Sequence, residues 1–463
     1  MKIGLCGNIA NNNYNLAKNL RRKGCDVYLI LDSLDDGFSM SQPIWEDADF
    51  QLQTDLVMNP QPFQKNFREN KILEKIKKET QWSSPSWVIE RKVSARNKAD
   101  LQLSLLLRFP YFLLKEFKTL IKIFKIFRRN LFLLPYGIAF FYLHLPTIRE
   151  MRKYDFLVTS FRAPIYAYLA NRPYIVYPCG AEVIELPLLK EKKWDKMTAI
   201  FQKKAFAQMK LFFTHSPELL EAIEKLGYKG YFFPHPIVDL DKCRPQNIKV
   251  VDLLDSESEK EIIEASRNKF IFFVPSRQNF YWKGSDKLLR AYGRLVKEKR
   301  GQVFMILAGW GGDIEKSKKI IKELGIEEDV YLLPYALSKP GLIKFYNAAD
   351  GICDILADVS SYGTSALEAL ACAKPVITFI NTEKFKFYAS DFSPPPVLNA
   401  CTEEEIFNQM KKLVENRKLC TEIGQQSRKW VVENYGEESI KKFIKIIENV
   451  YQESSSSSYL ENN

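Results

Sequence analysis

A short segment in the second half of the chain carries an arginine and a lysine–glycine pair on a predicted loop between a strand and a helix. The apolar run Phe270–Val274 is typical of a buried parallel strand, and apolar residues recur at helical spacing from Lys287 onward. Arg277 and Lys283 would therefore lie at the carboxyl edge of a sheet, where open α/β sheets bind ligands. A guanidinium and an ammonium beside a helix N-terminus can hold a diphosphate, although a solvated basic loop is the simpler alternative.

A second segment with ligand-binding character follows further along the chain. The sequence predicts a strand over residues 351–356, then a small glycine-containing loop, then a helix that carries Glu368 near its start. Free backbone N–H groups at such a loop can hold a phosphate, and a carboxylate one turn into the helix can accept bonds from two ribose hydroxyls. The loop residues expected to contact the phosphate and the sugar are Ser360, Tyr362, Gly363, Thr364 and Ser365.

Together these two segments resemble the donor half of glycosyltransferase family 4, retaining enzymes of the GT-B fold. In that family an arginine and a Lys-Gly pair grip the nucleotide diphosphate, and a Gly-aromatic-Gly loop leads into a Leu-Glu-Ala helix. The resemblance is specific over residues 250–450 and weaker before them. It implies that Arg277 and Lys283 act on the diphosphate during catalysis and that Glu368 holds the ribose. It also implies that the backbone around Pro334 and Tyr335 borders the base.

Two positions depart from the family pattern. Ser360 stands where the family usually has the first glutamate of a Glu-x7-Glu pair, so only Glu368 remains of that pair. Cys179 stands where a His-Gly-x-Asp-like sequence would have its histidine. Both departures concern the donor sugar, and they leave open an altered sugar pocket or an inactive relative.

The N-terminal end of the chain reads as a Rossmann-like strand, asparagine-rich loop and helix. It lacks a G-x-G-x-x-G sequence, so a dinucleotide site is not indicated. The resemblance implies that this loop faces the acceptor across an interdomain cleft, whereas any single asparagine there could equally serve only to cap the helix. The residues assigned to the acceptor side of the cleft are Gly7, Asn8, Asn12, Asn13, Gly180 and Glu182.

Length and composition set further bounds on the protein. At 463 residues the chain should form two domains, and 46% hydrophobic residues provide ample core. Eight cysteines without a C-x-x-C pair and only three histidines argue against a zinc site and a disulfide scaffold, and they favour reduced thiols and a cytoplasmic location. We expect no metal in the site and no cofactor, because the nucleotide-sugar is a substrate. The Asp239-Leu240-Asp241 sequence falls at the predicted hinge, and no signal peptide precedes the first strand.

The predicted fold class is α/β. Strands and helices alternate after residue 270, which predicts a doubly wound parallel sheet. The resemblance implies GT-B architecture, with two Rossmann-like doubly wound domains facing a cleft and a C-terminal helix crossing back to the first domain. The expected divisions are an acceptor domain over 1–240 with a basic amphipathic insertion near 101–148, a nucleotide-sugar donor domain over 241–436, a crossover helix over 437–452 and a disordered tail over 453–463.

Residues 111–129 combine bulky apolar side chains with regularly spaced cations. Recurring at steps of three and four, and so forming one stripe on a helix, are Lys115, Lys118, Lys122, Lys125 and Arg129. The side opposite this stripe should carry Leu113, Phe117, Leu120, Phe124 and Phe127. This pattern is typical of a helix lying in an anionic bilayer interface, and the alternative is a core helix whose lysines face water. The uncharged stretch 131–148 is short for a membrane span and contains helix breakers, which favours a buried or interfacial role.

The function that these features predict is transfer of a sugar from a nucleotide-sugar donor, with retention, to an acceptor such as a lipid-linked or cell-envelope glycan. The net charge of +12 would then serve an anionic membrane surface on the cytoplasmic side, since no nucleic-acid module is apparent. His144, His215 and His235 are better explained by packing than by general base catalysis. The alternatives are another GT-B reaction such as sugar-nucleotide epimerisation, and a non-catalytic membrane-associated assembly partner with a degenerate donor site.

Overall fold

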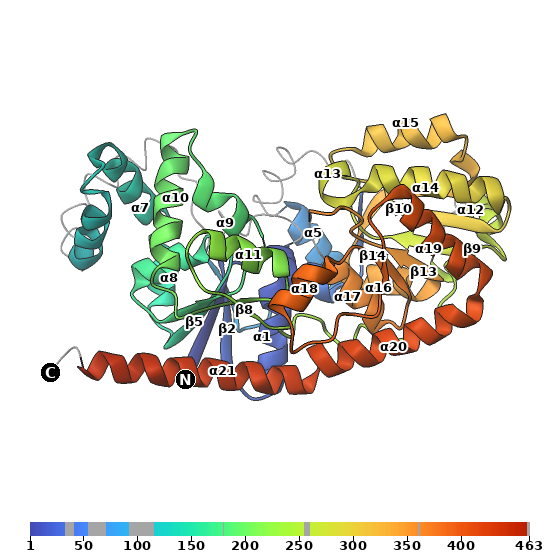
Figure 1. The fold of residues 1–463 in the computed structure, drawn as a ribbon. Helices are drawn as coiled ribbons and strands as arrows, with labels where there is room; N and C mark the ends of the chain where they lie inside the picture. The colour runs from blue at the N-terminus through green and yellow to red at the C-terminus, as the bar shows by residue number, and fades with distance from the viewer. Residues whose placement is uncertain are drawn as a thin grey trace.

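Two parallel β-sheets, each covered by helices on both faces, organise the protein (Figure 1). The computed structural model describes residues 1–32, 41–53, 71–91, 115–178, 180–253, 260–359 and 362–460. Figure 1 shows the first domain, coloured blue to green, beside the second domain, coloured yellow to orange.

The first domain is built on a seven-stranded parallel sheet. Its strands, in spatial order, are β4 (Val88–Arg91), β2 (Asp26–Asp32), β1 (Lys2–Cys6), β5 (Phe156–Thr159), β6 (Tyr174–Val176), β7 (Leu211–Thr214) and β8 (Tyr231–Phe232). Its helices are α1 (Asn12–Arg22), α2 (Ile44–Asp47), α5 (Lys71–Thr80), a helix over 115–127, α7 (Leu134–Met151), α8 (Ala163–Ala170), α9 (Ala181–Ile184), α10 (Lys193–Phe206) and α11 (Pro217–Lys225). The central strands are buried on both faces, which explains their nearly continuous apolar sequences. The chain order reverses between β1 and β5, so a crevice is expected at their carboxyl ends.

The second domain repeats this design with a six-stranded parallel sheet. Its strands, in spatial order, are β11 (Val330–Leu333), β10 (Val303–Ala308), β9 (Phe270–Val274), β13 (Gly351–Cys353), β14 (Val376–Thr378) and β15 (Leu398–Asn399). Its helices are α12 (Lys260–Ser266), α13 (Phe280–Lys283), α14 (Ser285–Glu298), α15 (Ile314–Leu324), α16 (Lys339–Ala348), α17 (Thr364–Ala371), α18 (Thr382–Tyr388), α19 (Glu403–Glu415) and α20 (Arg417–Tyr435). Here the order reverses between β9 and β13.

A long C-terminal helix, α21 (Glu437–Leu460), returns from the second domain and runs along the first (Figure 1). Lys23 of α1 pairs with Glu437 at 2.7 Å, and the Ser439 hydroxyl donates to the Pro234 carbonyl at 2.6 Å. The helix continues past residue 452, so the expected tail over 453–463 is corrected as far as Leu460. Extending an existing helix needs no new nucleation, and the Ser454 hydroxyl bonds to the Val450 carbonyl at 2.7 Å.

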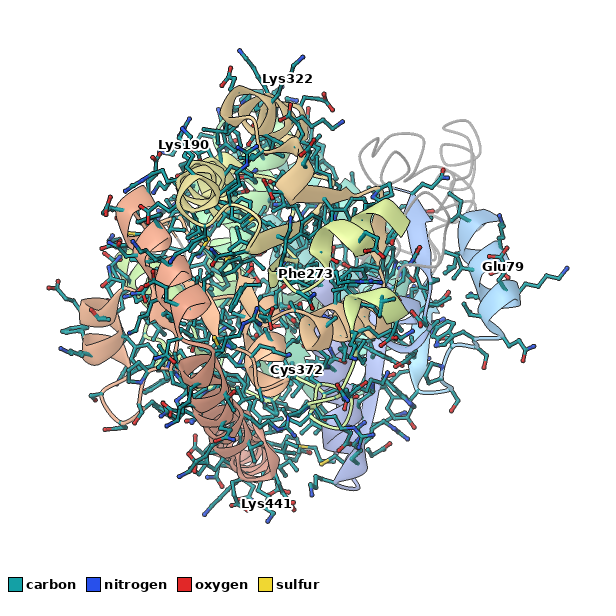
Figure 2. All side chains as sticks on the ribbon, turned by 90° about the vertical axis from the view of Figure 1, so that its right-hand side faces the viewer. Glu79, Lys190, Phe273, Lys322, Cys372 and Lys441 are labelled. Carbon is teal, nitrogen blue, oxygen red and sulfur yellow. The ribbon has the colours of Figure 1, made fainter. Side chains whose placement is uncertain are left out.

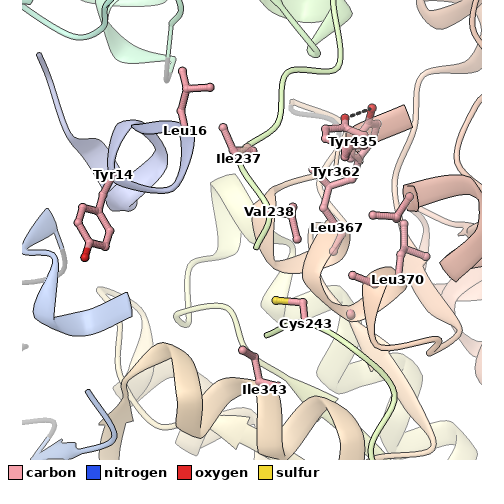
Figure 3. Close-up of a cluster of buried hydrophobic side chains, with 14 of the residues drawn as sticks. Tyr14, Leu16, Ile237, Val238, Cys243, Ile343, Tyr362, Leu367, Leu370 and Tyr435 are labelled. Atoms are coloured by element: carbon pink, nitrogen blue, oxygen red, sulfur yellow. Dashed lines mark hydrogen bonds between the residues drawn. The ribbon is translucent and has the colours of Figure 1, made fainter. Parts of the chain in front are cut away.

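The largest hydrophobic core is shared by the two domains. Figure 3 shows Tyr14 and Leu16 of the first domain, Ile237 and Val238 of the hinge, and side chains of the second domain in one cluster. Separate cores lie within each domain. In Figure 2 Phe273 and Cys372 lie in the interior, whereas charged side chains such as Lys322 and Lys441 project at the periphery.

The domains are joined a second time, away from the hinge. Strand β3 (Gln51–Gln53) of the first domain pairs antiparallel with β12 (Tyr335–Leu337) of the second, with Leu52 opposite Ala336. Trp45, Ala48, Leu52 and Ala336 belong to a small apolar cluster beneath this pair. A short strand pair stabilises little by itself, so this cluster and the polar contacts around it must hold the junction.

Candidate functional site

Arg277 follows β9 on a tightly held loop, as the sequence predicted, whereas Lys283 is the last residue of the short helix α13. The side chain of Gln278 is buried and bonds to the Ala308 carbonyl at 3.1 Å, while its backbone N–H donates to the Trp310 carbonyl at 2.7 Å. Asn279 caps the short helix α13 by accepting from the Trp282 N–H at 2.7 Å. Since the two residues after Arg277 are fixed, its exposed side chain leaves the loop from a defined point.

The glycine after Lys283 is required by close packing. Gly284 has φ +67°, and a Cβ there would lie 2.9 Å from the backbone of Leu356. The Leu356 N–H also donates to the Lys283 carbonyl at 3.0 Å. A side chain at Gly284 would therefore displace the loop after β13 from the loop after β9.

Lys283 lies in an electrostatic environment that contains both signs of charge. Desolvation lowers the pKa of Lys283, Asp354 opposes this shift, and the nearby Arg277 adds to it. Two cations that repel each other here can be neutralised by an anionic ligand such as a diphosphate. Asp354, at the end of β13, is buried and accepts from the Ser276 hydroxyl. The sequence reasoning missed Asp354; a polar residue directly after an apolar strand was the available signal.

The glycine-containing loop before α17 meets the first domain where that helix begins. The Thr364 hydroxyl lies 3.5 Å from the side-chain oxygen of Asn12, so the asparagine-rich loop does face this helix N-terminus. Gly363 caps the helix in an extended conformation, and Ser365 follows it in the first turn. The first N–H groups of a helix have no partner within it and can bind an anion. Ser360 lies outside the described residues.

Tyr362 is placed differently from the prediction. Its side chain is 3% exposed, and its hydroxyl lies 3.4 Å from that of Tyr435 (Figure 3). The rings of His215 and Trp430 also pack against it. The aromatic side chain therefore anchors the loop in the shared core, because burying a large ring there is more favourable than exposing it in the cleft.

Glu368 is buried and already engaged by two side chains of α16. Its carboxylate forms an ion pair with Lys339 and accepts from the Tyr346 hydroxyl at 3.2 Å. Lys339 also lies 3.8 Å from Glu46 of the first domain. Burial lowers the pKa of Lys339, but the charges of Glu368 and Glu46 outweigh burial and leave this pKa above its ordinary value.

Neither Lys339 nor Glu46 could be found from motif spacing, since no local pattern brings them to Glu368.

Pro334 and Tyr335, expected to border the base, lie at the start of β12, where the backbone of Tyr335 is opposite Gln53. The Phe50 carbonyl accepts from the Ser338 N–H at 3.1 Å, and Lys344 pairs with Asp49 at 2.6 Å. The first domain therefore covers this edge of the second.

In the asparagine-rich loop, two of the predicted acceptor residues have structural roles. Asn8 is fully buried and donates to the Ser41 carbonyl at 2.7 Å, while Asn13 donates to the carbonyls of Cys6 and Gly7 at 3.1 and 2.9 Å. Buried amides need hydrogen-bond partners, and these backbone carbonyls provide them. Gly7 has φ +88°, and a Cβ there would collide with the Ser160 carbonyl. Asn12 alone of the three predicted asparagines reaches toward the second domain.

The other acceptor residues lie at the carboxyl end of β6. Gly180, at φ +132°, precedes α9, and Glu182 in its first turn is fully buried. Glu182 accepts from the Phe161 N–H at 2.8 Å and thereby ties the loops after β5 and β6 together. Phe161 itself has φ +56°, a strained conformation for an aromatic residue. Cys179 lies outside the described residues.

The histidines and the hinge acids are explained by packing and pairing. Desolvation lowers the pKa of His215 to about 4 and that of His235 well below its ordinary value, so both are neutral near pH 7. His144 contacts Asp32 at 3.2 Å. Asp239 forms ion pairs with Lys18 at 2.9 Å and Arg22 at 3.1 Å, and these cations lower its pKa to about 2 against the effect of burial. Among the described residues, no group of three or more His, Cys, Asp or Glu side chains is arranged to hold a metal.

The predicted basic stripe lies on a helix, as expected, but not with every cation outward. Lys115, Lys118, Lys125 and Arg129 are exposed. Lys122 turns inward, donates to the Tyr168 carbonyl at 2.6 Å and lies over the Tyr168 ring, and desolvation lowers its pKa to about 8. Phe127, expected on an outward apolar side, is buried, and Leu113 lies outside the described residues.

Comparisons with known proteins agree with this geometry. Residues 255–430 match the model of the family "Glycosyl transferases group 1". An uncharacterized glycosyltransferase of Methanocaldococcus jannaschii is 25% identical over 197 residues, which are 41% of this chain and 48% of that protein. A poly(ribitol-phosphate) alpha-N-acetylglucosaminyltransferase of Staphylococcus aureus is 27% identical over 160 residues, which are 33% of this chain and 30% of that protein. The chain thus spans about half or less of the length of these relatives.

Solved structures extend the likeness to both domains. A sucrose-phosphate synthase of Thermosynechococcus elongatus superposes with a TM-score of 0.58 at 13% identity, covering 99% of this chain and 100% of that one. HepE of Anabaena, solved in complex with UDP-glucose, gives a TM-score of 0.57 at 14% identity, covering 98% and 100%. At these identities the likeness establishes the fold. Residues 255–430 therefore match the glycosyl transferases group 1 model within a two-domain protein of the GT-B fold, as the sequence resemblance implied.

Proposed function

We propose that the protein is a retaining glycosyltransferase that takes a sugar from a nucleotide-sugar donor. The observation that carries this proposal is that Arg277 and Lys283, two cations, lie close together at the carboxyl edge of the second sheet. Asp354 and the N-terminus of α17 lie beside them. HepE was solved with UDP-glucose, which makes UDP the first nucleotide to test.

The chemistry follows from the charge that develops on the leaving group. As the bond from the sugar to the diphosphate breaks, negative charge grows on the phosphate oxygens, and Arg277 and Lys283 would stabilise it. A preorganised donor of this kind contributes roughly 100- to 1,000-fold to turnover. His235 is buried, His215 is partly buried, and both are neutral near pH 7, so we assign the acceptor proton to the leaving diphosphate on the same face of the sugar. That route leads to retention of configuration.

The acceptor would approach from the first domain, where Asn12 meets Thr364. The Staphylococcus aureus relative is named for transfer to poly(ribitol-phosphate), which supports a cell-envelope polymer as one acceptor class to test. We place the protein in the cytoplasm, because its eight cysteines include no C-x-x-C pair and do not form the pattern of a disulfide scaffold.

Turnover assays with defined variants test this proposal. Hydrolysis of UDP-glucose and UDP-N-acetylglucosamine would be followed by release of UDP, and NMR would identify the first anomer formed. Arg277→Ala and Lys283→Ala should each lower turnover by roughly 100-fold or more. The matched controls, Arg300→Ala and Lys297→Ala, replace exposed cations at the far end of α14 and should leave turnover unchanged. Equal turnover in all four variants would refute the assignment.

A non-catalytic role is the second candidate, and one observation favours it. Glu368, expected on the ribose, is occupied by Lys339 and Tyr346, and the first domain covers the neighbouring edge. A protein of this kind would bind UDP weakly or not at all, and no donor would be turned over with any acceptor. Retained UDP binding without turnover would instead indicate a donor or acceptor not yet supplied.

A further inference from the structure

A ridge of exposed apolar side chains runs along the helix over 115–127 and the turn that follows it. The exposed fractions are 61% for Phe117, 39% for Ile121, 52% for Phe124, 58% for Leu131 and 82% for Phe132. We call these five residues the apolar ridge. Figure 1 shows this part of the chain, coloured teal, at the end of the first domain farthest from the second domain.

The ridge is not the packed side of its helix. Ile123 and Phe127 fill that role, because Gly137 of α7 comes so close that a Cβ there would lie 2.6 Å from the Phe127 ring. Residues 117, 121 and 124 recur at steps of four and three, so they share one helix face that points away from α7. Packing in the core therefore does not explain why Phe117 and Phe124, on this face, are aromatic.

Within residues 115–132 the exposed charged side chains are all cations. Glu116 is the one acidic residue between 115 and 132, and its buried carboxylate pairs with Arg149 at 3.0 Å and Arg152 at 2.8 Å. Lys118, Lys125 and Arg128 are exposed beside the ridge. The exposed face therefore combines bulky apolar groups with cations and has no carboxylate of its own.

We propose that the apolar ridge and the cations beside it form a docking surface for an anionic lipid bilayer. Phenylalanine and leucine side chains would enter the boundary between headgroups and acyl chains, while the ammonium and guanidinium groups pair with lipid phosphates. A second copy of the chain fits this surface less well, because two such faces would bring like charges together. The proposal stands apart from the proposed transferase activity, since no residue of the donor site takes part in it.

The protein attaches to the bilayer through this surface and does not span it with α7. Residues Leu131–Met151 are long and apolar enough to cross a membrane by length and composition. However, α7 packs in the core of the first domain, where the His144 ring and the Thr147 hydroxyl both contact Asp32 of β2. Extracting α7 would leave the buried Asp32 carboxylate without these partners.

Vesicle flotation of the full-length protein tests the surface. The vesicles would contain phosphatidylcholine alone, or phosphatidylcholine and phosphatidylglycerol in equal parts. We expect binding to the anionic vesicles, lowered about 30-fold by Lys118→Gln with Lys125→Gln, because each basic residue near the surface contributes about fivefold. Phe117→Ser, Phe124→Ser and Phe132→Ser should each lower binding about tenfold. These variants should also be released from the vesicles by salt, because the apolar part of the binding is lost.

Matched controls lie on the second domain. Phe387 is 76% exposed, so Phe387→Ser removes an exposed ring outside the ridge, and Lys318→Gln with Lys319→Gln removes two exposed cations of α15. Both controls should bind vesicles like the wild type, and all variants should keep the wild-type affinity for UDP. Equal binding to neutral and anionic vesicles, no binding at all, or losses as large in the controls would each overturn the proposal. So would a wild-type dimer in gel filtration that the phenylalanine variants convert to monomer, since the ridge would then be a subunit interface.

Discussion

Replacement of Lys339 by methionine should destabilise the protein strongly, because it strands two buried carboxylates. Lys339 is the cation shared by Glu368, which is 2% exposed, and Glu46, which is 4% exposed. Methionine fills a similar volume, so the change removes the charge and little packing. The two carboxylates come from different domains, and the loss therefore falls on the contact between them.

The expected loss of unfolding free energy follows from the burial of the two carboxylates. Breaking a buried pair by removing one partner costs about 3–5 kcal/mol, because the remaining charge is left uncompensated. Tyr346 and Asn15 each keep one bond to these carboxylates, at 3.2 and 3.1 Å, so we expect the lower end of that range. Burial already raises the pKa of Glu368 while Lys339 opposes this shift, so in Lys339→Met the pKa should rise further. Protonation of Glu368 would then remove the uncompensated buried charge. The loss of unfolding free energy relative to the wild type should therefore shrink as the pH falls below the raised pKa of Glu368.

Urea unfolding followed by tryptophan fluorescence measures the effect. The control is Lys344→Met on the same helix, which breaks the exposed pair with Asp49 and should cost less than about 1 kcal/mol. Adding Glu368→Gln to Lys339→Met should recover much of the loss, since the stranded charge is removed. The reasoning fails if Lys339→Met costs no more than Lys344→Met, or if the double variant is no more stable than Lys339→Met.

Three further outcomes are expected. Asn13→Ala should lower the free energy of unfolding by about 1–3 kcal/mol by removing two buried hydrogen bonds, whereas Asn12→Ala should stay within about 0.5 kcal/mol in the same urea titration. Gly284→Ala should cost about 1–3 kcal/mol through strain at positive φ and should weaken UDP binding in calorimetry, because the loop that carries the lysine would shift; unaltered stability would show that the loop adapts. His215 has a folded-state pKa of about 4, below its ordinary 6.5, so the unfolded state binds the proton first as the pH falls. Stability should therefore drop by about 2 kcal/mol between pH 6.5 and pH 5 on account of this group, and His215→Gln should flatten that part of the profile.

Much of the second domain could be predicted because its strands are uninterrupted apolar runs between polar loops. β9 was predicted with the bounds that the structure has, and Arg277 lies on the loop that follows it, whereas Lys283 ends the short helix α13. β13 ends at Cys353, short of the predicted residue 356, and the Asp354 side chain that follows it accepts from Ser276.

The rest depended on contacts between distant parts of the chain. The pairing of β3 with β12 joins residues from different domains, and a strand of three residues has no recognisable pattern of its own. Periodicity showed that residues 115–127 form an amphipathic helix, but it could not show which face packs. That choice depends on Arg149 and Arg152, which hold Glu116 inward and so rotate Phe117 to the surface.

The central claim is that Arg277 and Lys283 grip the diphosphate of a nucleotide. Calorimetric titration with UDP tests it most directly, because binding does not depend on knowing the sugar or the acceptor. Arg277→Ala and Lys283→Ala should each weaken UDP binding by roughly 10- to 100-fold, in line with hydrogen bonds to charged groups, while Arg300→Ala binds like the wild type. Wild-type binding in both site variants, or no UDP binding by the wild type at any attainable concentration, would contradict the account.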